Sequence, residues 1–247
     1  MPFYRDAVHP EEPMTALPLT LTPLDLLALA LLCLSWLGVT RVIEHPPRRR
    51  ASVSVLMKTY RRDWMRQFVH RDPRIFDGNI LASLREGTSF FASACMIAIG
   101  GGLALIGNTD PLAGIARDLE AAEIPALLWR LKILLVLLFV ANAFLKFVWA
   151  HRLFGYCAIM MAAVPNDPRL PETEARALAA AEVNIQAARN FNIGLRAVYF
   201  ALGALGWLAG PWGLIAGTAI VTAMTLRREF ASGSRRAILR DLGERRP

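Results

Sequence analysis

The chain has 247 residues, 55% of them hydrophobic, and a mean hydropathy of +0.37. The apolar residues gather in long runs, which argues against a soluble globular protein. The formal net charge is +8, but the basic residues flank the apolar runs, as Arg50, Arg227 and Arg228 do. This placement is typical of membrane proteins with a positive cytoplasmic side, and it argues against nucleic-acid binding.

The first apolar run predicts a membrane-spanning helix over about residues 23–43. Its length is close to the ~20 residues that a helix needs to cross a bilayer. Pro23 suits the first helical turn, and Pro46 and Pro47 end the helix. A signal peptide would need a basic start and a small-residue cleavage site, so we expect the run to be retained as a span.

Residues 44–86 are dense in arginine and predict a first cytoplasmic segment. Apolar and aromatic residues recur at three- and four-residue steps from Val53 to Phe68, beside a basic stripe, which is typical of an amphipathic helix. Two interpretations remain open: the helix lies in the lipid headgroup layer, or it packs on its own protein. In the first, the headgroup contacts would come from Lys58, Arg61, Arg62, Trp64 and Arg66.

The second span is predicted over about residues 87–106. A turn and a helix cap are expected before it, at residues 77–79, where the sequence reads Asp-Gly-Asn. Within the span, Ala94, Ala98 and Gly102 recur every four residues and form a face on which another helix could pack closely.

The third span is predicted over about residues 126–149, with Trp129 and Trp149 near its ends. The loop before it, residues 108–125, is acidic and is expected outside the cytoplasm. The apolar pattern continues to Val164, so the helix can project beyond the bilayer.

Residues 150–194 predict a second cytoplasmic segment, and an apolar stretch of 195–226 follows. This stretch is either one long kinked helix or a hairpin of two short spans, over about 195–209 and 212–226. The Gly-Pro step and the arginine-rich tail after it favour the hairpin. Close packing of the arms is expected from the glycines Gly206, Gly210, Gly213 and Gly217.

These elements predict an all-α fold, a polytopic helical membrane protein with about five transmembrane helices and one cytoplasmic amphipathic helix. Residues 1–247 form a single integral membrane domain with a periplasmic amino terminus and a cytoplasmic carboxyl terminus. The cytoplasmic segments are 44–86, 150–194 and 227–247.

Several short stretches of the chain share a pattern with one known family. They are 60–65, 74–77 and 89–93, Lys146 with Phe147, and 192–196 followed by Tyr199 and Phe200. In these stretches the chain resembles a family of uncharacterised membrane proteins, the family of domain of unknown function 599. The resemblance extends over most of the chain and implies a multi-span bacterial-type membrane protein, without an activity, cofactor or substrate.

A polar pocket is one candidate site. Asn142 and Lys146 share a face of the third span, and Arg85, Glu86 and Arg196 lie near the predicted cytoplasmic ends of neighbouring spans. Ionisable groups at this depth tend to point into the bundle and pair. Alternatively, the basic residues extend to the membrane surface and Arg85 and Glu86 form a surface pair.

Neither a metal site nor a catalytic set is expected. The histidines are scattered, and the cysteines Cys33, Cys95 and Cys157 include no close pair. Gly100, Gly101 and Gly102 lie inside an apolar span and lack the lysine of a phosphate loop. The sequence therefore predicts no cofactor, and it favours a protein without enzymatic activity over an enzyme.

Three functions remain in consideration. The first is a structural or accessory protein of the bacterial inner membrane that associates with anionic lipids or partner proteins, as a homo-oligomer or in a larger complex. The second is an oligomeric transporter or channel for small solutes. The third, an enzyme acting on lipid headgroups, would need acids or a metal that the sequence does not place.

Overall fold

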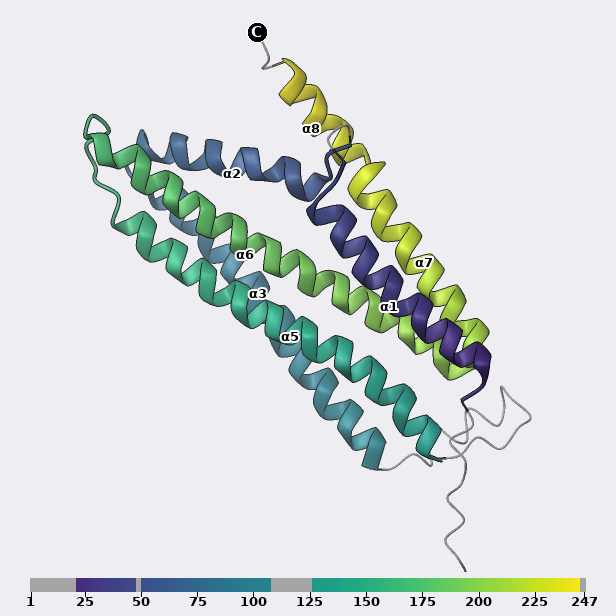
Figure 1. The fold of residues 1–247 in the computed structure, drawn as a ribbon. Coiled ribbons are helices and arrows are strands. Elements are labelled where there is room, and N and C mark those ends of the chain that lie inside the picture. The colour runs from purple at the N-terminus through teal and green to yellow at the C-terminus, as the bar shows by residue number, and fades with distance from the viewer. Residues whose placement is uncertain (1–20, 48–49, 108–125, 245–247) are drawn as a thin grey trace, which may run out of the picture.

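The computed structural model describes residues 21–47, 50–107 and 126–244, and in these ranges the regular elements are all helical. Two long helices, α5 (Ala126–Ala162) and α6 (Pro171–Ala204), form the centre (Figure 1). The other helices are α1 (Pro23–Glu44), α2 (Val53–Val69), α3 (Ile75–Gly107), the short 3-10 helix η1 (Leu205–Ala209), α7 (Gly210–Phe230) and α8 (Gly233–Glu244).

Four helical stretches of the described chain are long and apolar enough to cross a membrane: Pro23–Glu44, Ile75–Gly107, Leu127–Ala162 and Pro171–Gly243. In the most apolar window of each stretch, 11% to 39% of the residues are buried inside the protein, so most side chains there are at least partly exposed, which suits contact with lipid. The protein is therefore a polytopic helical membrane protein, as the sequence predicts.

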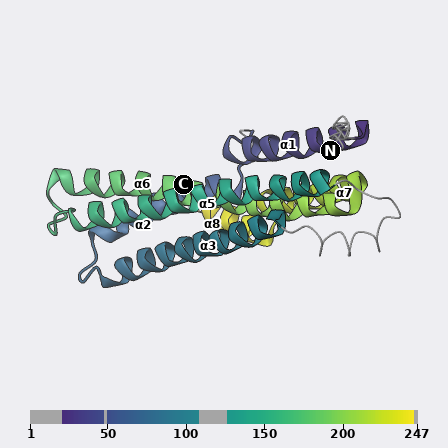
Figure 2. The ribbon, with the colours of Figure 1, turned by 90° about the horizontal axis from the view of Figure 1, so that it is seen from below.

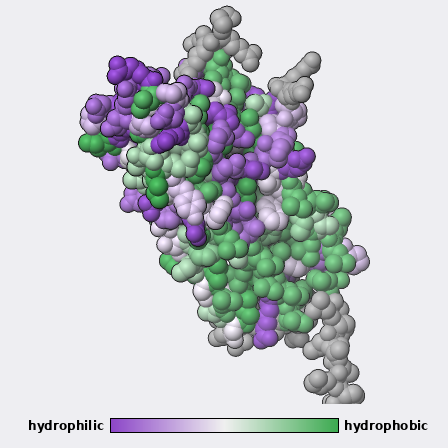
Figure 3. Space-filling model, turned by 60° about the vertical axis from the view of Figure 1, so that its left-hand side comes forward, coloured by the Kyte–Doolittle hydropathy of each residue, from purple (hydrophilic) through white to green (hydrophobic). Residues whose placement is uncertain are grey.

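The molecule has a polar half and an apolar half (Figure 3). The polar half contains α2, α8, the first turns of α3 and α6 and the last turns of α5 (Figure 1). The apolar half contains α1, α7 and the remaining lengths of α3, α5 and α6. Helices α5 and α6 thus run through both halves and connect them.

Helices α1 and α3 lie on opposite sides of the α5–α6 pair (Figure 2). Helix α3 packs on α5, whereas α1 packs mainly on α7. At the centre, the ring of Phe147 lies over Gly194, where an added Cβ would be 2.8 Å from the ring. Phe91 stacks on the same ring at a centroid distance of 5.3 Å, so one aromatic cluster joins α3, α5 and α6.

The turn before α3 lies earlier than the sequence predicts. It precedes Ile75 and includes a cis bond between Asp72 and Pro73, whereas residues 77–79 are already helical. Asp77 is fully buried and accepts hydrogen bonds from Trp64 and Arg71. A paired carboxylate in the first turn favours a helix, which explains why this stretch does not form the predicted turn.

The stretch after residue 195 reverses direction, as the hairpin interpretation predicts. An added Cβ on Gly206 would overlap the carbonyl oxygen of Gly213, and Gly217 approaches Gly203 in the same way. Gly210 serves the turn instead of the packing, because its φ of 86° is a conformation that favours glycine. That each arm crosses a membrane stays a prediction.

The small-residue face of α3 is used only in part. Gly102 is buried against Leu137 of α5, with no room for a side chain. Ala94 and Ala98 are exposed. Within the described residues, no helix covers these two alanines, so a helix–helix contact there stays a prediction.

Candidate functional site

A polar cavity lies where the end of α1, the start of α2, the middle of α6 and the end of α7 meet. We call it the junction cavity. Its main part has a volume of about 260 Å³, and a smaller part of about 90 Å³ adjoins it through the shared residues Asn192 and Glu229. The charged residues that line it are Glu44, Lys58, Arg61, Arg189, Arg196, Arg228 and Glu229.

Glu44, the last residue of α1, is bound by two arginines of α6. Its carboxylate lies 2.5 Å from Nη2 of Arg196 and 2.9 Å from Nε of Arg189. The two arginines are seven residues apart and therefore lie on one face of α6. The side chains of Glu44 and Arg196 are only 5% and 4% exposed, so each charge depends on the other for its stability.

Glu229, near the end of α7, is bound by the first turn of α2. Its two carboxylate oxygens each accept a hydrogen bond of 3.0 Å, one from the backbone N–H and one from the hydroxyl of Ser54. Negative charge is favourable at the start of a helix. The neighbouring Ser52 caps α2 and donates to the carbonyl oxygen of Ile43 at 2.8 Å, which fixes the connection from α1.

The basic residues of the cavity are not balanced by its acids. Lys58 lines the cavity and makes no hydrogen bond or ion pair with any described residue. Arg61 donates to Asn184, and burial lowers the pKa of its guanidinium below the ordinary value, although arginine stays protonated at neutral pH. With both acids already bound, an excess of positive charge remains available to an anion.

The residues predicted to contact headgroups divide into two groups. Lys58 and Arg61 face the junction cavity. In contrast, Arg62 pairs with Glu182 of α6, Arg66 pairs with Asp63 and Glu174, and Trp64 donates to Asp77 of α3.

The apolar face of α2 packs on its own protein. Met65 and Phe68 are buried with Phe154 of α5 and Ala177 of α6. This is the second of the two interpretations that the sequence left open. Contact of the basic face with lipid headgroups stays a prediction.

The five residues of the predicted polar pocket lie on three helices, α3, α5 and α6, and a shared site stays a prediction. No hydrogen bond or ion pair within the described ranges joins any two of them. Arg196 is bound to Glu44, and Arg85 lies near His151, whereas Glu86 is exposed. Asn142 and Lys146 are half-buried on α5.

Sequence reasoning missed Glu44, Ser54, Arg189, Asn192 and Glu229 of the junction cavity. The seven-residue spacing of Arg189 and Arg196 was a usable signal, since it places both on one helix face. Glu44 gave little signal, because an acid at the end of an apolar run is ordinarily a surface residue. The part of the chain that the structure describes holds no group of three or more metal-binding side chains.

Comparison with protein families matches residues 27–234 to the family described as "Protein of unknown function, DUF599". The chain belongs to this family. The match covers most of the chain and confirms the resemblance noted in the sequence. Neither the curated proteins nor the solved structures contain a match, so membership of the DUF599 family supplies no activity for the junction cavity.

Proposed function

We propose that this DUF599 protein is an accessory protein of the bacterial inner membrane that binds an anionic phospholipid headgroup in the junction cavity. The polar half and the carboxyl terminus would lie in the cytoplasm and the amino terminus in the periplasm. This orientation follows the distribution of lysine and arginine, which gather on the cytoplasmic side of membrane proteins.

The observation that carries the proposal is Lys58, which has no polar partner among the described residues and lines a cavity with more basic than acidic residues. The cavity lies where α1 ends at Glu44 and α7 ends at Phe230, at the boundary between the apolar and polar halves. In a membrane, this boundary corresponds to the headgroup layer. A phosphate there would receive charge-assisted hydrogen bonds from Lys58, Arg61 and Arg189.

The test is lipid binding by the purified protein in phosphatidylcholine nanodiscs with increasing amounts of phosphatidylglycerol or cardiolipin. Native mass spectrometry would report the bound lipids. We expect preferential retention of the anionic lipids, and Lys58→Gln should weaken it about fivefold, because one basic residue near an anionic surface contributes ~1 kcal/mol. Added salt should weaken binding, because it screens the exposed part of the attraction.

The matched control is Arg62→Gln, which also removes one positive charge from α2. Arg62 is exposed and already paired with Glu182, so retention should change little. Equal losses of lipid retention in both variants would show that the headgroups bind a diffuse basic surface and not the junction cavity. Unchanged retention in Lys58→Gln, or equal binding of phosphatidylcholine, would overturn the proposal.

The proposal also includes association with other proteins: this protein would form a homo-oligomer or belong to a larger membrane complex. Gentle extraction followed by mass spectrometry of the copurifying proteins tests this part. A stable complex would indicate the process in which the protein acts. The transporter and the headgroup-modifying enzyme have less support, because the five residues of the predicted polar pocket are not joined in the described structure.

A further inference from the structure

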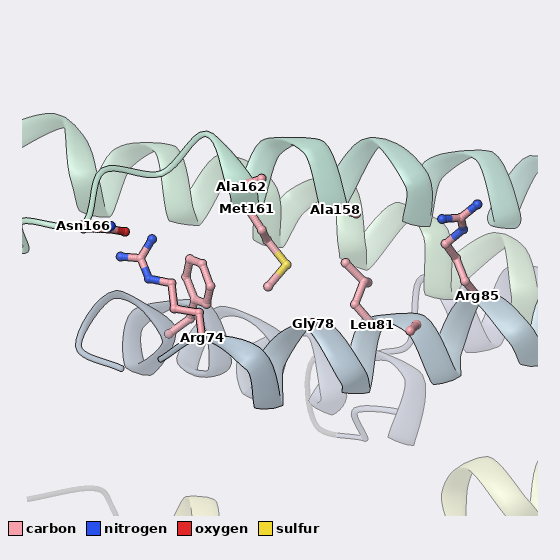
Figure 4. A pocket seen from close by; sticks show the side chains of 10 residues that line it. Arg74, Gly78, Leu81, Arg85, Ala158, Met161, Ala162 and Asn166 are labelled. Carbon is pink, nitrogen blue, oxygen red and sulfur yellow. The ribbon is translucent and has the colours of Figure 1, made fainter. Parts of the chain in front are cut away.

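A second cavity lies in the polar half, between the first turns of α3 and the last turns of α5 (Figure 4). Its volume is about 340 Å³, within the range of small-molecule sites. Phe68 of α2 also lines the cavity, and Leu81 and Met161 face each other across it (Figure 4). Gly78 leaves the cavity open, because an added Cβ there would meet nothing within 4 Å.

The two basic residues of this cavity have different roles. Arg74 closes one end: it donates to the carbonyl oxygens of Val164 and Pro165, both at 2.9 Å, and stacks on Phe68. Arg85 lies toward the other end (Figure 4) and is exposed. Its nearest described polar partner is the ring of His151, at 3.5 Å.

The lining combines apolar walls with an arginine that has no acidic partner. The other lining residues are Ala82, Ala158, Ala162 and Asn166, so the described lining contains no carboxylate. An apolar body would lie against Leu81, Ala158 and Met161, and the flexible methionine can adjust to its shape. A carboxylate at one end of that body would pair with Arg85.

We propose that the α3–α5 cavity binds a medium-chain fatty acid, with the carboxylate on Arg85 and the hydrocarbon chain between α3 and α5. This site is separate from the junction cavity and does not depend on the proposed binding of phospholipid headgroups. Arg85 supplies the positive charge that a carboxylate needs, and Leu81, Ala158 and Met161 supply the apolar walls that a hydrocarbon chain needs.

The experiment is photolabelling of the full-length protein in phosphatidylcholine nanodiscs with a decanoate that carries a diazirine near the end of its chain. Peptide mass spectrometry locates the label. We expect labelling within residues 78–82 and 158–162, competition by decanoate, and much weaker competition by decanol, which lacks the charge. Labelling only at other positions, or equal competition by decanol, would overturn the proposal.

Two variants test the residues involved. Arg85→Gln should weaken competition by decanoate about two- to fivefold, as expected for one exposed ion pair. Gly78→Leu should fill the cavity and abolish the label, with no loss of stability, since leucine favours a helix more than glycine does. The control is Arg169→Gln, which removes a charge outside the cavity. Labelling that both cavity variants leave unchanged would refute the assignment.

Discussion

At Glu44, one carboxylate pairs with two guanidinium groups of α6. We expect Glu44→Ala to lower the free energy of unfolding by about 3–5 kcal/mol, because it leaves the buried Arg196 without a counterion. Chemical denaturation in a mild detergent would measure the change. The control Glu182→Ala removes the exposed partner of Arg62 and should cost at most ~1 kcal/mol. Equal losses in the free energy of unfolding of the two variants would show that burial does not make the Glu44 contact more important than the exposed one.

Individual polar contacts were the least predictable part of the site. The sequence predicts that Arg196 lies near the cytoplasmic end of a span and leaves open whether it pairs or extends to the membrane surface. Its partner Glu44 is 152 positions away. Ser54 and Glu229 are 175 positions apart, and neither belongs to a recognisable motif. Helical spacing reports only which residues share a face, so it does not identify a partner on another helix.

At the scale of elements, the hairpin of α6 and α7 depends on close backbone contact. We expect Gly206→Ala to destabilise the protein by about 1–3 kcal/mol, because the new methyl group would overlap the carbonyl oxygen of Gly213. Thermal unfolding in detergent would measure this effect.

The control for Gly206→Ala is Gly101→Ala on α3, where an added Cβ meets nothing within 4 Å. This variant should be neutral or more stable by up to ~1 kcal/mol, because alanine favours a helix more than glycine does. A neutral Gly206→Ala would mean that the two arms do not pack as closely as described.

Most helices could be predicted from the sequence, but several of their ends could not. Proline marks the end of α1 and the starts of α6 and α7. The start of α3 could not be predicted from the turn signals at residues 77–79. Asp77 accepts hydrogen bonds from Trp64 and Arg71, and these contacts favour a helix there. Helix α6 continues past residue 194, where hydropathy predicts that a cytoplasmic segment ends and a span begins. A change in hydropathy does not break backbone hydrogen bonds.

For the whole molecule, the proposed orientation can be measured by cysteine labelling in intact cells. In a variant without Cys33, Cys95 and Cys157, we expect Ala209→Cys to react with a membrane-impermeant maleimide added outside. Ser234→Cys should react only after the inner membrane is opened. All three positions Ala209, Gln67 and Ser234 are exposed in the described structure, and Gln67→Cys provides a second inner site. Labelling of Ala209→Cys only from the inside would contradict crossing by the two arms.

The length of α6 has a mechanical consequence. Its 34 residues form a rod about 50 Å long, whereas the hydrocarbon layer is only ~30 Å thick. A helix that tilts to match a thinner or thicker bilayer moves its far end most, and a tilt of ~5° displaces the end of a 50 Å rod by about 4 Å. Because Arg66 near the end of α2 pairs with Glu174 in the first turn of α6, this displacement would carry the carboxyl-terminal end of α2 with it, whereas Glu229 of α7 holds the first turn of α2 in place. A change in bilayer thickness would therefore pivot α2 about its end at the junction cavity.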